Sequence, residues 1–208
     1  MNSQTERLFF AGPVGPIEAL RDAPASGEST RGVAVIAHPH PLFGGAMDNK
    51  VVQTLARACV ACGYVAVRLN FRGVGGTAGV HDEGRGELDD LLAVARQAAP
   101  EGPLALAGFS FGAFVISHAV QRLWGERQVE HIVLVGTAVG HFTVAAVPAD
   151  AHLRTLVVHG EADDVAPLSA VMDWARSQAL PVTVIPGGGH FFHGQLPLLK
   201  GLVMRHLQ

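Results

Sequence analysis

The chain has 208 residues, of which 49% are hydrophobic and 16% are charged, and its formal net charge is -3. This length suits one α/β domain over residues 1–208 and is short for two, and the composition excludes a disordered protein. No block of lysine and arginine occurs in the sequence. We therefore expect neither nucleic acid nor an anionic membrane surface as a partner.

Sequence features that report on the cellular compartment favour the cytoplasm. The first residues, MNSQTERLFF, lack the basic start and apolar core of a secretory signal. No apolar run approaches the ~18 residues of a membrane span. Cys59 and Cys62 are too few for a disulfide framework, and they fall at the expected end of a helix, where packing is favoured over thiolate chemistry.

The first two elements form a predicted β-hairpin, ERLFFAG and IEALRDA, joined by PVGP. A polar loop over 25–32 follows. The chain then alternates apolar strands with helices. We expect Asp48 to cap the first helix and Gly63 to end it. The expected strands are 33–38, 64–71, 104–109, 131–136, 153–160 and 181–187, and the expected helices are 48–62, 86–98, 110–125, 167–178 and one at the C-terminus.

Strands that are apolar throughout and alternate with helices predict a mostly parallel sheet with helices on both faces. In such sheets ligands bind at the carboxyl ends of the strands. The loop over 135–152 is too short to form a lid, so the predicted site is open to solvent. Candidate functional residues are therefore sought in the loops that follow strands.

One such position is Ser110, which lies between Gly108 and Gly112 in the stretch LALAGFSFGAF. In a G-x-S-x-G turn the serine has strained backbone angles, and side chains at the glycine positions would collide with neighbouring elements. The turn exposes the hydroxyl and places the Phe111 amide at a helix N-terminus, where it can stabilise an oxyanion. The alternative interpretation is a helix-capping serine with glycines for close packing.

A nucleophilic serine needs a histidine base, oriented in turn by a carboxylate. Both are expected on later loops, in the order serine, acid, histidine. The stretch VVHGEADDVAP supplies Asp163 directly after a strand, and IPGGGHFFHG supplies His190 after the last strand. We predict that Ser110, Asp163 and His190 form a catalytic triad, with Glu161 as a second candidate acid and Asp164 capping the next helix.

The second oxyanion amide is expected from the loop HPHPLFGG. Its two prolines have no N–H group, so the donor is His40, Leu42 or Phe43. We favour Leu42, with His40 second. Of the side chains near the site, we expect His40 and Phe191 to contact the substrate.

Neither a cofactor nor a metal ion is expected. The stretch FRGVGG carries only part of the dinucleotide-binding fingerprint, and the downstream acid is absent. The pairs His38/His40 and His190/His193 have spacings known from metal sites, but nearby carboxylates do not complete a ligand set. A structural role is favoured for each of these features.

Five stretches together resemble the small, lid-less bacterial α/β-hydrolases near the dienelactone-hydrolase-like proteins: HPHPLFGGAMDNKVVQTLARA, LNFRGVGGT, GFSFGAF, HGEADDVAPL and GGGHFFHG. The resemblance covers about residues 31–206. It implies an α/β-hydrolase fold with an eight-stranded, mostly parallel sheet and no lid domain. It also implies that the catalytic triad of the family corresponds to Ser110, Asp163 and His190. Dienelactone hydrolases use a cysteine nucleophile, so dienelactone cleavage is not expected of this serine.

These residues predict a serine hydrolase that cleaves small acyl esters or thioesters through an acyl-enzyme, as carboxylesterases and thioesterases do. Two other functions are compatible with the same fold. One is a non-catalytic protein that binds a small ligand or another protein, and the other is a peptidase or amidase with an open cleft.

Overall fold

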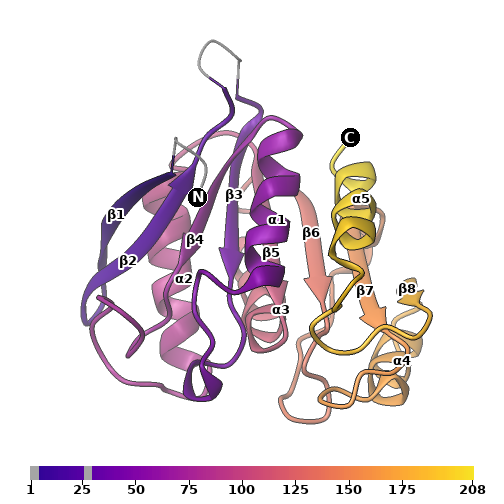
Figure 1. The fold of residues 1–208 in the computed structure, drawn as a ribbon. Helices are drawn as coiled ribbons and strands as arrows, with labels where there is room; N and C mark the ends of the chain where they lie inside the picture. The colour runs from indigo at the N-terminus through magenta and orange to yellow at the C-terminus, as the bar shows by residue number, and fades with distance from the viewer. Residues whose placement is uncertain (1–4, 26–29) are drawn as a thin grey trace.

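The computed structural model describes residues 5–25 and 30–208 (Figure 1). Residues 26–29 of the polar loop predicted over 25–32 lie outside these described residues. The predicted N-terminal hairpin is formed by β1 (Thr5–Gly12) and β2 (Gly15–Asp22), which pair antiparallel from Thr5↔Asp22 to Gly12↔Gly15. The turn between them contains Pro13 and Val14. Proline favours a turn here because its ring fixes the backbone angle φ near the value that the turn requires.

The sheet has eight strands in the order β1-β2-β4-β3-β5-β6-β7-β8. In the part of the sheet that runs from β4 through β3, β5, β6 and β7 to β8, every neighbouring pair of strands is parallel. The carboxyl ends of the parallel strands therefore meet along one edge, which is the lower edge in Figure 1. These strands are β3 (Gly32–Ala37), β4 (Tyr64–Leu69), β5 (Leu104–Phe109), β6 (Val129–Val135), β7 (Thr155–Gly160) and β8 (Val182–Ile185).

Helices cover both faces of the sheet, as predicted. On the near face in Figure 1, α1 (Lys50–Ala61) lies beside α5 (Leu196–His206). The other face is covered by α2 (Arg85–Ala98), α3 (Phe111–Leu123) and α4 (Leu168–Arg176). Each face has its own apolar cluster, and alternate residues of β5 enter one cluster or the other. Because both faces are buried, the strands appear in the sequence as continuous apolar runs.

The start of α1 differs from the prediction. The helix begins at Lys50, and the Asn49 side chain accepts a hydrogen bond from the Val51 amide at 2.9 Å. Asp48 is exposed and lies one residue too early to cap the helix, so its predicted role is wrong. Asn and Asp cap helices about equally well, which is why the sequence did not distinguish these neighbours.

Residues 136–154, all of them described, connect β6 to β7 through a loop and the short 3-10 helix η2 (Ala149–Arg154). No lid domain is inserted in this connection. Within the described part of the chain, none of the helices combines the length and apolar character needed to cross a membrane.

Candidate active site

Ser110 occupies a sharp turn between β5 and α3, with φ 57° and ψ -118°. Its amide donates to the Val135 carbonyl at 2.9 Å, which ties the turn to β6. A side chain at Gly108 would place its Cβ 2.5 Å from the Gly112 carbonyl, and a side chain at Gly112 would collide with the Ala37 carbonyl oxygen. The two glycines are therefore required for α3 to pack this closely on β5 and β3.

The structure brings Ser110, His190 and Asp163 into one hydrogen-bonded chain. His190 Nε2 lies 2.9 Å from Ser110 Oγ, and His190 Nδ1 lies 2.7 Å from Asp163 Oδ2. All three side chains are buried, with residue exposures of 4% to 7%. With Nδ1–H donating to the carboxylate, Nε2 is left as the acceptor for the serine proton.

The Asp163 carboxylate is held by more than the histidine. Its Oδ1 accepts hydrogen bonds from the amides of Val165 at 2.9 Å and Ala166 at 2.8 Å. Burial acts to raise the pKa of the Asp163 carboxyl, but the hydrogen bonds from His190, Ala166 and Val165 together hold the pKa below its usual value. Asp163 is therefore an anion at neutral pH.

The other two acidic residues of this loop have different surroundings. Glu161 Oε2 accepts from the Gly187 amide at 2.8 Å, so it joins the loops after β7 and β8 instead of contacting His190. Asp164 does not cap the next helix: α4 begins at Leu168, with Pro167 at the N-cap and no side-chain cap. That prediction is wrong, because the Asp163 carboxylate takes the free amides of the turn.

The loop after β3 forms a 3-10 turn, η1 (Pro41–Phe43), capped by a histidine side chain. The Leu42 amide donates to His40 Nδ1 at 3.2 Å, and the Phe43 amide donates to the His40 carbonyl at 3.1 Å. The Leu42 amide, which the sequence favoured as an oxyanion donor, is therefore already engaged. Within the described residues the His40 amide has no hydrogen-bond partner, which favours His40 over Leu42 as the candidate donor, and the assignment stays a prediction.

Phe111 is the first residue of α3, where an amide has no carbonyl partner inside the helix. Its side chain is fully buried, and its ring lies 4.9 Å from the His40 ring between centroids. The side chains of the two candidate oxyanion residues, His40 in the loop after β3 and Phe111 at the start of α3, are thus in contact.

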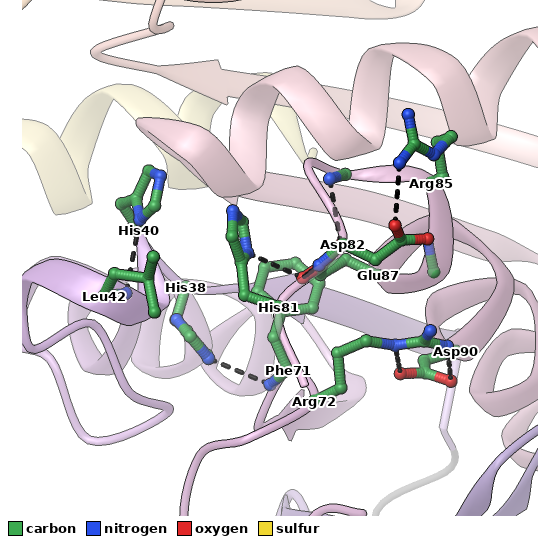
Figure 2. A network of polar contacts seen from close by, with 12 residues as sticks. His38, His40, Leu42, Phe71, Arg72, His81, Asp82, Arg85, Glu87 and Asp90 are labelled. Carbon is green, nitrogen blue, oxygen red and sulfur yellow. Dashed lines mark hydrogen bonds and ion pairs between the residues drawn. The ribbon is translucent and has the colours of Figure 1, made fainter. Parts of the chain in front are cut away.

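His38 has the structural role that the sequence favours, because its ring anchors the loop that carries His40. Its Nε2 accepts from the Phe71 amide at 2.9 Å (Figure 2). Its Nδ1 lies 2.6 Å from the Pro39 carbonyl, to which it donates. Burial lowers the pKa of His38 to about 4, so the ring is neutral at pH 7 and has one donor and one acceptor nitrogen. A neutral ring satisfies both bonds and joins the loops after β3 and β4.

One histidine of each pair with metal-like spacing is engaged in these networks. Both ring nitrogens of His38 and of His190 have partners. In the ranges 5–25 and 30–208, no group of three or more His, Cys, Asp or Glu side chains is placed to hold a metal ion.

A cleft of about 560 Å³ opens onto Ser110 and His190. His40 and Phe191, the predicted substrate contacts, lie in its lining. Among the described residues that line the cleft, Asp164 is the only Asp, Glu, Lys or Arg. The full lining is Pro39, His40, Phe43, Gly44, Gly45, Asn49, Ser110, His141, Asp164, Val165, His190 and Phe191.

The sheet order and the turn at Ser110 are those of the α/β-hydrolase fold. A lid-less α/β serine hydrolase from Xanthomonas campestris is 36% identical and has a TM-score of 0.86, with 100% of this chain and 95% of that chain covered. An α/β serine hydrolase homologue from Coxiella burnetii is 37% identical with a TM-score of 0.83, covering 98% and 97%.

An uncharacterized protein of Rickettsia prowazekii (strain Madrid E) is 31% identical in an alignment of length 199 that covers 89% of this chain and 82% of the relative. No protein-family model matches the chain. On these similarities the chain belongs to the α/β-hydrolase superfamily, among its lid-less serine hydrolases.

Proposed function

We propose that this hydrolase is a serine esterase that cleaves small acyl esters or thioesters through an acyl-enzyme. The observation that carries the proposal is the chain of hydrogen bonds from Ser110 Oγ through His190 to Asp163, placed at an open cleft. A protein that only binds a ligand has no use for a base and an acid aligned on a hydroxyl.

In the proposed first step, His190 Nε2 takes the Ser110 proton while Oγ forms a bond to the acyl carbon. The carbonyl π electrons move onto oxygen, and the amides of His40 and Phe111 stabilise this oxyanion. The tetrahedral intermediate collapses with cleavage of the bond to the alcohol or thiol, which takes its proton from His190. His190 then activates water, which releases the acid and regenerates Ser110.

The cleft favours a short and uncharged substrate. Its volume of about 560 Å³ is within the usual range for small-molecule sites, and Pro39, Val165 and Phe191 give it apolar walls. The Asp164 carboxylate repels anions, and no described Lys or Arg of the lining offsets it. We therefore propose uncharged esters or thioesters of short acyl groups as substrates.

Stopped-flow hydrolysis of p-nitrophenyl acetate and butyrate tests this function. We expect a burst of about one nitrophenol per protein before the steady state, because acylation by an activated phenol ester outruns deacylation. The matched hemisuccinate ester should show a several-fold lower kcat/KM because of Asp164. A purified, folded protein that turns over no ester in the series contradicts the proposal. Faster cleavage of the matched p-nitroanilides would indicate an amidase.

A further inference from the structure

A third ring contacts both residues assigned to the oxyanion site. The His81 ring lies 4.8 Å from the His40 ring and 5.5 Å from the Phe111 ring, measured between centroids. His81 belongs to the loop between β4 and α2, and Figure 2 shows it beside the loop that carries His40 and Leu42. Three loops that follow β3, β4 and β5 therefore meet through three side chains.

His81 is held in place by a buried carboxylate. Its Nδ1 donates to Glu87 Oε1 at 2.8 Å (Figure 2). Glu87 lies in the first turn of α2, is fully buried, and also accepts from the amides of Asp82 at 3.0 Å and Gly84 at 2.9 Å. These three donors satisfy the carboxylate, and the two amides hold the oxygens in place for the bond from the imidazole ring.

The helix that carries Glu87, α2, is itself held by a buried ion pair. Arg72 Nε and Nη2 donate to the two oxygens of Asp90 at 2.9 and 2.8 Å, and both side chains are buried (Figure 2). This bidentate pair fixes α2 to the loop that leaves β4. The His81 ring is thus attached to a buried, ion-paired part of the fold, whereas the η1 turn that follows His40 is exposed at Leu42 and Phe43.

We propose that His81, oriented by Glu87, is a positioning residue for the oxyanion site, which is an inference that rests on the proposed esterase function. Its ring packs against the His40 and Phe111 rings, which also contact each other and the Phe142 ring, and so helps to hold the two residues where their amides converge on one oxygen. Such donors must lie about 2.7–3.1 Å from the developing oxyanion, so a small shift of the His40 loop weakens them. Because they act on charge that forms in the transition state, the loss falls on kcat more than on KM.

Three variants test this role: His81→Ala removes the ring, His81→Phe keeps a ring but not the bond to Glu87, and His118→Ala is the matched control. The His118 ring contacts Phe114, its Nε2 bonds to the Thr143 carbonyl, and it contacts neither oxyanion residue. The readouts are kcat and KM for p-nitrophenyl acetate, and the Kd of butylboronic acid. The boronate adds to a serine hydroxyl and places an anionic oxygen in the oxyanion site. Thermal melting identifies any variant that does not fold.

We expect His81→Ala to lower kcat about 10- to 100-fold, with KM within about 3-fold of the wild type, and to weaken boronate binding by a similar factor. His81→Phe, which keeps a ring but loses the bond that orients it, should recover only part of this loss, and His118→Ala should match the wild type. A folded His81→Ala protein with wild-type kcat and boronate affinity overturns the inference, as does an equal loss in His118→Ala. A wild type that neither hydrolyses esters nor binds the boronate refutes the proposed function itself, and the inference with it.

Discussion

Replacing Ser110 with alanine is expected to lower kcat/KM for p-nitrophenyl acetate by about 10⁴- to 10⁶-fold. The variant keeps the elbow, the two candidate oxyanion amides and the cleft, but it has no oxygen to form the acyl-enzyme. The fold should survive, because the Ser110 hydroxyl has a hydrogen bond only to His190 among the described residues. Initial rates at matched protein concentration measure the loss, and thermal melting verifies the fold.

Ser169→Ala is the matched control for this loss. Ser169 is an exposed serine of α4, outside the lining of the cleft, and its replacement should leave the rate unchanged. If the Ser110→Ala protein kept more than about a hundredth of the wild-type rate, another nucleophile or a directly activated water would have to be responsible.

Asp163→Asn is expected to lower kcat by about 10³- to 10⁴-fold through the wrong tautomer of His190. The amides of Val165 and Ala166 both point at Oδ1, so the amide oxygen of asparagine takes that position. The NH₂ group then faces His190 Nδ1, which must accept. The ring proton moves to Nε2, where it faces Ser110 Oγ, and the histidine is no longer a base for the serine.

Two neighbouring carboxylates provide controls for this second prediction. Glu161→Gln and Asp164→Asn remove the same charge from the same loop, but neither side chain bonds to His190 in the structure. Both variants should keep kcat for an uncharged ester within several-fold. A rate loss in Glu161→Gln as large as that in Asp163→Asn would contradict the assignment of the acid.

The sequence was sufficient to predict the fold and to bring three distant residues together. Apolar strands that alternate with helices specify a parallel sheet, and in a parallel sheet the loops after β5, β7 and β8 open at one edge. That geometry alone places Ser110, Asp163 and His190 on one side of the molecule. The G-x-S-x-G spacing then selects the serine, because only glycine fits beside the elbow.

Features that depend on side-chain rotamers or on the path of an irregular loop were not predictable in this way. The sequence leaves the amides of His40, Leu42 and Phe43 as candidate donors and favours Leu42, whereas in the structure the His40 side chain accepts a hydrogen bond from the Leu42 amide. The contact between His81 and Glu87 depends on how the loop before α2 folds, for which the sequence has no periodic signal. Which of Asp48 and Asn49 caps α1 likewise depends on the exact residue at which the helix begins, and the sequence does not specify that residue.

Intact-mass analysis after incubation with a fluorophosphonate, followed by peptide mapping, tests the central claim most directly, because the reagent modifies only an activated serine. We predict a single adduct on Ser110, absent from the Ser110→Ala protein and strongly slowed in a His190→Ala protein. A folded wild type that acquires no adduct, or acquires it on another residue, would contradict the assignment of Ser110 as the nucleophile.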